Sequence, residues 1–327
     1  MRNLITDVRG LRVGHAADAA LASGVTAIVF DRPATASVSI RGGAPGGRDT
    51  ALLDTDMTVE TVDAILLSGG SAFGLDAAGG AQAALRAAGR GFAIGTIRVP
   101  IVPQAIVFDL LNGGDKNWGD RPPYWEMGRR AVEAAGETFA LGTAGGGYGA
   151  TTATLKGGLG SASAVTSTGH RVGAIVIVNA IGSATLGRSP HFWAAPYEQN
   201  GEFGGRGWPS PLPEEALAMH IKGHTPATTI ALVATDAVLT KPQARRLAIM
   251  ADDGLARAIR PSHAALDGDT VFATATGQHP LADPLRDLTE LGHVAADCLA
   301  RAVARGVYEA TALPFPGALP DWKSTFA

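Results

Sequence analysis

The sequence predicts an α/β fold, a layered sandwich in which the sheets are mostly antiparallel. In the first third of the chain, short apolar runs alternate with glycine-containing turns, as in a series of strands. Farther along, strand-like runs are mixed with helical patterns, but the two do not alternate regularly as βαβ units would. No repeat of fixed period is present. A mainly parallel sheet is therefore disfavoured.

The first half of the chain contains three strand patterns and two helix patterns. The strands are expected at 25–30, 34–40 and 63–67, and the helices at 75–88 and 129–135. The region 142–164 consists mostly of Gly, Ala, Ser and Thr and could pass for a linker. We expect a buried, closely packed turn region instead, because two strong strands follow it and because such packing also requires glycine.

The second half contains the two strongest strand patterns. Residues 172–179 form the most apolar run of the chain, and a run rich in β-branched residues follows at 228–235. Between them, residues 183–226 are rich in Pro and Gly and predict a long irregular loop. One helix is expected over 242–259, where apolar residues fall on one side. A last helix begins at residues 283–284, where a capping Asp precedes Pro.

The composition excludes several classes of protein. At 327 residues and 46% hydrophobic content, the chain can bury a large core. Only 17% of residues are charged and the net charge is −3, so no basic surface for nucleic acid is indicated. The single cysteine, Cys298, cannot form an intrachain disulfide and suits a reducing compartment. With no apolar stretch of secretory or membrane-spanning length, we expect a cytoplasmic protein with no membrane partner.

Two glycine-rich segments resemble known site motifs only in part. Gly70-Ser71-Ala72-Phe73 lacks the last glycine of a nucleophile elbow. Because a strand leads into it and a helix follows, the turn 69–74 is either an anion-binding turn or a plain packing turn. Residues 145–149 are not followed by Gly-Lys-Ser/Thr, which excludes a Walker loop, and a dinucleotide fingerprint fits poorly. We therefore expect no cofactor.

The histidines offer weak candidates for a metal site. His220 and His224 stand four residues apart, but Gly223 and a nearby proline argue against a helix, and the Glu of H-E-x-x-H is absent. These are interpreted as loop histidines. His263 precedes Asp267 by four residues, which leaves a carboxylate-rich metallohydrolase site, with Asp269 as a further ligand, as a minor alternative.

The abrupt start of a strand at Thr228, directly after the long loop, permits a second interpretation besides β propensity. A threonine hydroxyl is a poor nucleophile without a base. A free α-amino group has a pKa near 8, so part of it is neutral at neutral pH. Cleavage of the Ala227–Thr228 bond would therefore place a nucleophile and its base on one residue, without any histidine.

Four other polar residues have both a plain and a functional interpretation. Asp267 and Asp269 flank a glycine, as in a solvated turn, but they could also orient a nucleophile and raise the pKa of its amine. Lys156 is one of five lysines and stands in an otherwise uncharged stretch. It is interpreted either as a solvated charge or as a hydrogen-bond donor near a reacting centre. Asn179 ends the most apolar strand, either as the start of a turn or as an oxyanion donor.

Taken together, these segments resemble the L-aminopeptidase/D-esterase family, which includes β-peptidyl aminopeptidases and the endo-type nylon-oligomer hydrolase. The resemblance runs through nearly the whole chain in the same order, and it is the combination that is specific. The segments that carry it are Gly10–His15, Arg41–Gly46, Leu67–Leu75, Leu155–Ser163, Val178–Asn179 and Thr228–Asp236.

The resemblance implies roles for individual residues. Thr228 matches the nucleophile at a new N-terminus, which is Ser in the aminopeptidases and Thr in the nylon-oligomer hydrolase. Asn179 matches the oxyanion-hole Asn, and Lys156 matches the Lys near the cleavage centre. Asp267 and Asp269 match the acidic pair of the nylon-oligomer branch.

The resemblance also implies a fold and an activity. The fold is a four-layer αββα sandwich, like that of N-terminal-nucleophile hydrolases but with different strand connectivity. The chain is expected to be one hydrolase domain that cleaves itself into residues 1–227 and 228–327. The two fragments stay together, and these pairs assemble into homo-oligomers. The expected substrates are small peptides or amides.

One position departs from the family pattern. Phe108 stands where other members carry a Tyr that helps to bind the substrate or its oxyanion, whereas the neighbouring Asp109 is retained. The substrate class therefore stays open among α-peptides, β-peptides, amino-acid amides and oligoamides. An alternative from a different class is a non-catalytic binding protein on the same scaffold, with an anion in the 69–74 turn.

Overall fold

The computed structural model describes residues 1–223 and 225–327. One large mixed sheet and a separate hairpin contain the strands: β1 (Leu11–Asp18), β2 (Ser23–Ile40), β3 (Gly47–Arg48), β4 (Thr61–Ser68), β5 (Phe92–Ile94), β6 (Ile97–Val99), β7 (Gln104–Ile106), β8 (Gly158–Val165), β9 (Arg171–Asn179), β10 (Thr228–Ala237) and β11 (Thr270–His279). The helices are α1 (Ala77–Ala87), α2 (Tyr124–Glu133), α3 (Lys241–Ala258), α4 (Pro284–Tyr308) and α5 (Trp322–Phe326).

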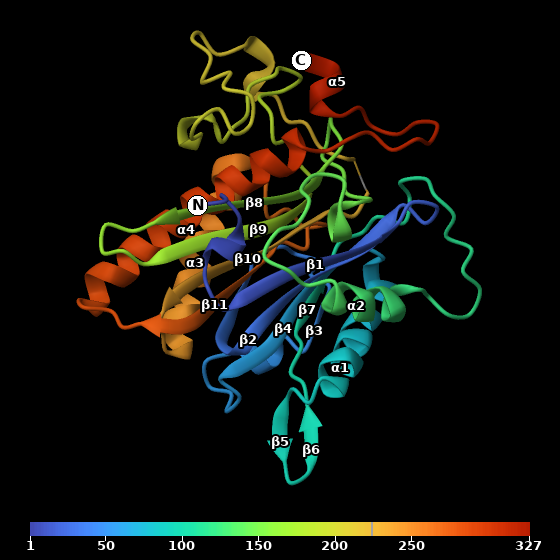
Figure 1. Ribbon diagram of the computed structural model, residues 1–327. Helices are drawn as coiled ribbons and strands as arrows, with labels where there is room; N and C mark the ends of the chain where they lie inside the picture. The colour runs from blue at the N-terminus through green and yellow to red at the C-terminus, as the bar shows by residue number, and fades with distance from the viewer. Residues whose placement is uncertain (224) are drawn as a thin grey trace.

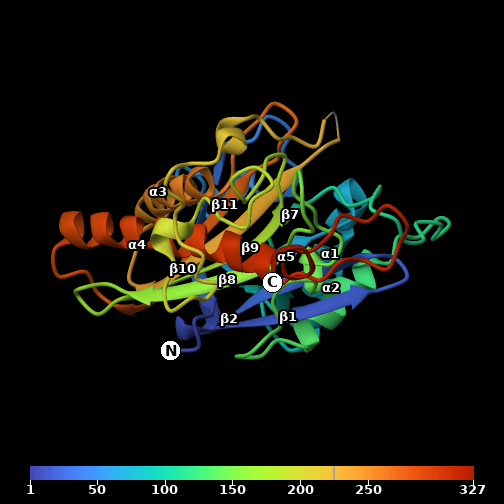
Figure 2. The same ribbon diagram turned by 90° about the horizontal axis from the view of Figure 1, so that it is seen from above.

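The large sheet has the order β3-β7-β4-β2-β11-β10-β9-β8, and β1 also pairs with β2. Among the described residues, only the β10–β11 and β4–β7 pairs are parallel, which agrees with the expected antiparallel character. Helices α3 and α4 cover one side and α1 and α2 the other (Figures 1 and 2). The β5–β6 hairpin projects from the body (Figure 1).

Three buried hydrophobic clusters show that the elements form four layers. One lies between α3–α4 and the strands β8 to β11, and another lies between α1–α2 and the strands β1, β2 and β4. The third lies between the two halves of the sheet, where Ile177, Ile230 and Phe272 meet Ile28 and Ile65. This arrangement is the αββα sandwich that the family resemblance implies.

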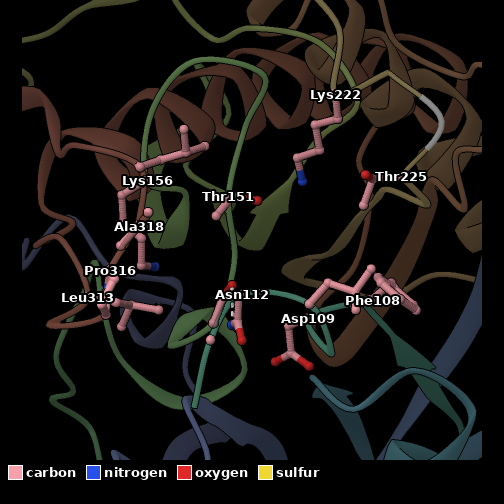
Figure 3. Close-up of a pocket in the computed structure, with 15 residues that line it drawn as sticks. Phe108, Asp109, Asn112, Thr151, Lys156, Lys222, Thr225, Leu313, Pro316 and Ala318 are labelled. Carbon is pink, nitrogen blue, oxygen red and sulfur yellow. Dashed lines mark hydrogen bonds between the residues drawn. The ribbon is translucent and has the colours of Figure 1, made fainter.

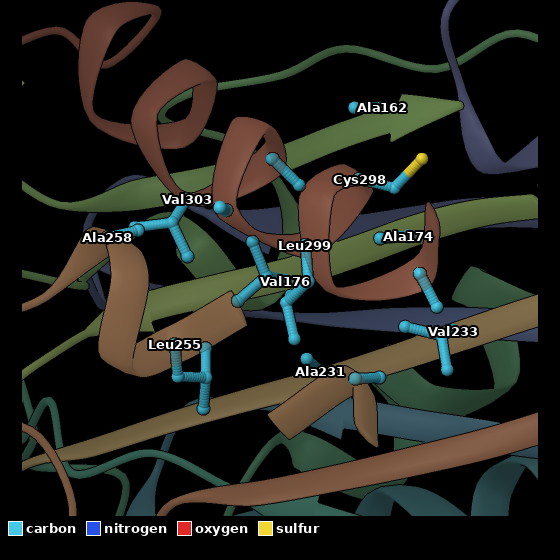
Figure 4. Packing of buried hydrophobic residues seen from close by; sticks show 14 of the residues in the cluster. Ala162, Ala174, Val176, Ala231, Val233, Leu255, Ala258, Cys298, Leu299 and Val303 are labelled. Carbon is cyan, nitrogen blue, oxygen red and sulfur yellow. The ribbon is translucent and has the colours of Figure 1, made fainter. Parts of the chain in front are cut away.

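The first cluster fixes where β10 sits. Residues of α3 and α4 pack on alternate residues of β9 and β10, as Figure 4 shows for Leu255, Leu299, Val303, Val176 and Val233. The other residues of β10, among them Ile230 and Leu232, face the cluster between the sheet halves. Because side chains alternate along a strand, Thr228 points to the same side as Ile230.

The strand β2 is longer than expected. The sequence predicts two strands, at 25–30 and 34–40, on either side of the polar triplet Asp31-Arg32-Pro33. In the structure the chain continues as one strand, with an irregularity between Val29 and Ala34 and the triplet exposed. Its first half pairs with β1 and β4 and its second half with β11, so β2 joins the two halves of the sheet.

The glycine-rich region 142–164 is packed, as expected, and it contains the strand β8. A Cβ atom on Gly160 would lie 1.8 Å from the carbonyl oxygen of Ala302 in α4. Glycine therefore lets the helix approach the strand directly. The sequence indicated no strand here, because the segment lacks the β-branched and aromatic residues that mark strands.

The remaining helices and strands agree with the sequence to differing degrees. Helix α4 begins at Pro284, and the Asp283 side chain accepts hydrogen bonds from the N–H groups of Leu285 and Arg286, as the capping pattern predicts. Helix α2 begins five residues before the predicted start, at Tyr124. Strands β1 and β11 were not predicted from the sequence. No helix in the described residues combines the length and apolar content needed to cross a bilayer.

Candidate active site

The candidate site lies where β10 begins, next to the end of β9. Thr228, the first residue of β10, pairs directly with Asn179, the last residue of β9, in antiparallel register. Directly opposed residues of an antiparallel pair have side chains on the same face and within about 5 Å at Cβ. The structure thus brings together two residues that are 49 positions apart in the sequence.

The peptide bond before Thr228 is tightly held. Ala227 forms a parallel bridge with Asp267, and its N–H donates to the carbonyl oxygen of Leu266 at 3.2 Å. The carbonyl oxygen of Ala227 accepts the Gly268 N–H at 3.0 Å and the hydroxyl of Thr228. Two donors therefore polarise the carbonyl group of the bond that the sequence analysis singled out.

The space beside Thr228 depends on Gly268. A Cβ atom at this position would lie 2.7 Å from Oγ1 of Thr228 and 3.0 Å from the carbonyl oxygen of Ala44. Contacts of this length do not occur without a shift of the neighbours, so any larger residue would displace the threonine side chain. The glycine between the two aspartates is therefore required by packing against Thr228 and not by a positive φ.

Asp269 holds the backbone next to Thr228, not its hydroxyl. Its Oδ1 accepts the N–H of Thr229 at 2.8 Å, and its Oδ2 accepts both the N–H and the Nδ1 of His263 at 2.9 Å. The side chain is 1% exposed. Asp269 thus contacts the candidate nucleophile through the following peptide group.

Asp267 is the least satisfied polar group of the site. Its side chain is fully buried, and neither carboxyl oxygen has a hydrogen-bond partner within the described part of the chain. Burial and the negative charge of Asp269 raise the pKa of Asp267 to about 8, although Lys222 and His263 oppose the shift. A carboxyl group with such a pKa can take up or release a proton near neutral pH.

Both ends of the Asn179 amide are hydrogen-bonded. Its Nδ2 donates to the carbonyl oxygen of Phe108 at 2.9 Å, and its Oδ1 accepts the N–H of Thr151 and the Nζ of Lys222, both at 3.0 Å. The side chain is therefore fixed in orientation, as the position of a buried amide requires. Nδ2 has a second hydrogen, for which no acceptor is present among the described residues.

Lys156 is buried, not solvated. Its Nζ donates to the carbonyl oxygens of Gly147, Ala150 and Gly157 at 2.9 to 3.2 Å, and its side chain is 1% exposed. Burial lowers the pKa of Lys156 to about 7, and the charge of Asp109 only partly opposes this. The plain interpretation of a solvated charge is therefore wrong.

Lys222 belongs to the same site, although the sequence analysis did not single it out. Its Nζ donates to both the carbonyl oxygen and the Oδ1 of Asn179, at 3.1 and 3.0 Å. Burial of the ammonium group lowers the pKa of Lys222 to about 7, with Asp267 opposing the shift and Lys156 adding to it. The rarity of lysine, which drew attention to Lys156, applies equally here and was the available signal.

A cavity of about 200 Å³ adjoins this group of residues. Figure 3 shows Lys222 and Thr225 on one side of it and Leu313, Pro316 and Ala318 on the other. Phe108, Asp109, Thr151 and Lys156 also line it, so both residues predicted to bind substrate are present. Thr228 is buried and is not among the residues that line this cavity.

The turn 69–74, interpreted either as an anion-binding turn or as a packing turn, binds a side chain of the protein itself. The N–H of Gly70 donates to Oδ1 of Asp109 at 2.8 Å, while Ser23 donates to Oδ2 at 2.6 Å. Burial raises the pKa of Asp109, with these two hydrogen bonds opposing the shift. The turn therefore anchors a residue of the cavity wall.

The alternative of a metal site depends on His220, His224 and His263. His224 lies outside the described residues. His263 contacts Asp269 and faces Asp252, whose Oδ1 is 3.8 Å from its Nε2. In residues 1–223 and 225–327, no three His, Cys, Asp or Glu side chains are arranged to hold a metal ion.

Comparisons with known proteins identify the family of the chain. The model of peptidase family S58 matches residues 3–317. An uncharacterized aminopeptidase of Mycobacterium tuberculosis is 43% identical, over 99% of this chain and 98% of the relative. The 6-aminohexanoate-oligomer endohydrolase of a Kocuria species is 28% identical, over 83% of this chain and 74% of the relative.

Solved structures resemble the whole chain in fold. A β-aminopeptidase of a Burkholderia species superposes with a TM-score of 0.71 at 24% identity, covering 99% of this chain and 92% of its own. The L-aminopeptidase D-Ala-esterase/amidase of Ochrobactrum anthropi, described as a variant of the Ntn hydrolase fold, gives 0.71 at 21% identity, covering 98% and 92%. The predicted fold class is confirmed.

Proposed function

The chain belongs to peptidase family S58, and from this premise we propose that it cleaves its own Ala227–Thr228 bond and then hydrolyses small amides with Thr228 as the N-terminal nucleophile. The family itself accounts for a hydrolase of peptide or amide bonds. The self-cleavage, the nucleophile and the residue roles are the proposal.

One observation carries the proposal. The carbonyl oxygen of Ala227 accepts hydrogen bonds from the Gly268 N–H and the Thr228 hydroxyl. Ala227 is also bridged through its backbone to Asp267, whose buried carboxyl has no hydrogen-bond partner in the described residues. A nucleophile and an oxyanion donor thus meet at one peptide bond, and the residue paired with Ala227 carries a carboxyl group that can accept a proton.

Self-cleavage begins with attack of the Thr228 hydroxyl oxygen on the carbonyl carbon of Ala227. The hydroxyl proton passes to ionised Asp267, and the Gly268 N–H stabilises the developing oxyanion. When the C–N bond breaks, the proton passes to the leaving nitrogen, and an ester joins Ala227 to the hydroxyl oxygen of Thr228. Water then hydrolyses this ester, which leaves a carboxylate on Ala227 and a free amine on Thr228.

Substrate hydrolysis uses the new amine as the base. It accepts the hydroxyl proton of Thr228 during attack on the substrate carbonyl and returns it to the leaving amine. Asn179, opposite Thr228 in the sheet, donates from Nδ2 to the oxyanion, and water hydrolyses the acyl ester. Separation of the ends at residues 227 and 228 gives the buried threonine access to the adjoining cavity.

The cavity suits a short, weakly charged substrate. Apolar groups from residues 313–319 form one wall, and the ammonium groups of Lys156 and Lys222 are occupied by protein carbonyl and amide oxygens. At about 200 Å³ it holds a small acyl group rather than a folded peptide. Small peptides, amino-acid amides and oligoamides are the proposed substrates, and Phe108 offers no hydroxyl to them.

The test is the intact mass of the purified protein together with two variants. Wild type should give fragments of about 23 and about 10 kDa, in proportion to their lengths of 227 and 100 residues, and the smaller should begin Thr-Thr-Ile-Ala. Thr228→Ser should still cleave itself, because it keeps the hydroxyl. Thr228→Ala should remain at 33.3 kDa and hydrolyse no amide. A Thr228→Ala protein that hydrolyses substrate would falsify the proposal.

A further inference from the structure

His263 stands between two buried carboxylates that come from different elements. Its Nδ1 and its own N–H both contact Oδ2 of Asp269 at 2.9 Å, and its Nε2 lies 3.8 Å from Oδ1 of Asp252 in α3. Asp252 and Asp269 are 3% and 1% exposed, whereas His263 is partly exposed. None of the sequence motifs assigns a role to this histidine in hydrolysis without a metal.

The contacts of His263 continue to the nucleophile. Beyond Asp269, the Oδ1 of the same carboxylate accepts the N–H of Thr229, the residue after Thr228. On the other side, Asp252 is held by the hydroxyl of Ser39 at 2.8 Å. The helix α3 is therefore connected through one imidazole to the first peptide group of β10.

We propose that His263 is a positioning residue of the active site, which as an imidazolium between Asp252 and Asp269 holds the Asp269 carboxylate on the Thr229 N–H and so orients Thr228. The inference rests on the proposed function. It adds to that function a charged group that contacts neither the scissile bond nor the substrate cavity.

The charges around His263 support this role. Asp269 and Asp267 face it from the segment before β11, Asp252 faces it from α3, and the hydrogen bond with Asp269 is the largest cause that raises the pKa of His263. The cations in reach of these carboxylates are Arg41, 3.3 Å from Asp252, and Lys222 beside Asp267. Within the described residues, neither of these cations contacts Asp269. His263 is therefore the group that places a positive charge beside the Asp269 carboxylate.

The backbone at His263 allows a well-matched variant. Its φ is +57°, in the left-handed region, which asparagine tolerates better than most residues. An asparagine Nδ2 also takes nearly the position of the histidine Nδ1. His263→Asn therefore keeps the backbone and a donor toward Asp269 but removes the charge and the reach to Asp252, whereas His263→Ala removes the donor as well.

The experiment follows self-cleavage of freshly synthesised precursor over a range from about pH 5.5 to about pH 9. With His263→Asn, the carboxylates lose a neighbouring positive charge, so the acid limb of the rate profile should move up by about one pH unit. With His263→Ala, cleavage should slow by about 100-fold, because the nucleophile is misplaced. Control His279→Asn changes a histidine that lies 3.9 Å from Asp236 at the far end of β11 and should leave the profile unchanged.

The outcomes separate this inference from the proposed function. If wild type stays intact at every pH, the proposed function fails and the inference fails with it. If wild type cleaves and His263→Asn has the wild-type profile, only the positioning role of His263 is wrong. Thermal unfolding of each variant identifies a misfolded protein, and if His263→Ala is unfolded, the profile of His263→Asn alone decides.

Discussion

Two clusters of polar and charged residues lie against different parts of the sheet, one where β10 and β11 begin and one beside residues 161–163 of β8, and their carboxylates have very different numbers of partners. The cleavage-site cluster contains Asp252, His263, Asp267 and Asp269. The α4 cluster contains Asn3, Glu202, Arg301 and Arg305. In the α4 cluster, Arg301 contacts both oxygens of Glu202, at 2.5 and 3.1 Å, and donates to Asn3 at 2.9 Å.

The pKa directions differ in the same way. Burial acts to raise the pKa of Glu202, but the hydrogen bond and charge of Arg301 outweigh it, and the net pKa is lowered. In the cleavage-site cluster, burial raises the pKa of both Asp252 and Asp267 and is not outweighed. A buried carboxylate left without a partner, as Asp267 is, costs stability, and such groups are typical of reacting centres. We infer that the α4 cluster stabilises the fold and the cleavage-site cluster serves the chemistry.

The largest effect is expected for Asp269→Asn. The variant removes the charge beside His263 and turns an amide toward a donor, so Thr229 and with it Thr228 lose their fixed position. Self-cleavage should slow by at least about 100-fold, as measured by the loss of the 33.3 kDa species with time. The control is Glu202→Gln, which should cleave at the wild-type rate. Equal rates for Asp269→Asn and wild type would show that the clusters do not differ in function.

Glu202→Gln should in turn have the largest effect on stability. It leaves the buried guanidinium of Arg301, 2% exposed, without its carboxylate. Breaking a buried pair in this way costs about 3 kcal/mol or more. Urea unfolding, carried out in the Thr228→Ala background so that the chain stays intact, should show a lower midpoint with an unchanged slope. A midpoint equal to that of the parent would remove the structural role of the cluster.

A smaller effect is expected in the pH dependence of stability, which should come from the cleavage-site cluster. Because the pKa of Asp267 is about 8 in the folded chain and near 4 when unfolded, folding takes up a proton between these values. Stability from this group is therefore highest at low pH and falls by about 1.4 kcal/mol per pH unit as pH rises from about 4 toward 8. Asp267→Asn should flatten this fall. Thermal unfolding of both proteins in the Thr228→Ala background, between about pH 5 and about pH 8, measures it.

If the two unfolding profiles run parallel, the pKa of Asp267 is not raised in the folded protein, and its carboxylate is too weak a base to accept the Thr228 proton near neutral pH. The raised pKa of His263 acts in the same direction above neutral pH, so the comparison between the variant and its parent, not the wild-type slope alone, isolates Asp267.

Much of the fold was predictable because the second half of the chain has strong local signals. The apolar run of β9, the β-branched run of β10 and the Asp-Pro start of α4 each mark an element in the sequence alone. The strand β8 could not be found in this way, because its glycines are there to let α4 approach. Nor could the single strand β2, because the tolerance of its polar triplet depends on exposure.

The site likewise contains residues that the local sequence identifies and contacts that only the tertiary structure reveals. Thr228, with its sudden strand start, and the Asp267-Gly268-Asp269 segment could be recognised locally. The hydrogen bonds from Lys222 to Asn179 and from His263 to Asp269 connect loops to strand ends, so no spacing in the sequence predicts them. The engaged orientation of the Asn179 amide, toward the Phe108 carbonyl, likewise depends on tertiary contacts.

The smallest effect is expected for Phe108→Tyr, which separates the cavity from the cleavage-site cluster. Asn179 contacts the backbone oxygen of Phe108, not its ring, so the added hydroxyl leaves that hydrogen bond in place. Self-cleavage should stay within about twofold of wild type, as for substitutions that break no buried contact. The ring does line the cavity, so any change should occur in kcat or KM for amide substrates. A large change in self-cleavage would mean that the cavity wall and the cleavage-site cluster act as one unit, because the hydroxyl reaches the scissile carbonyl before the chain is cut.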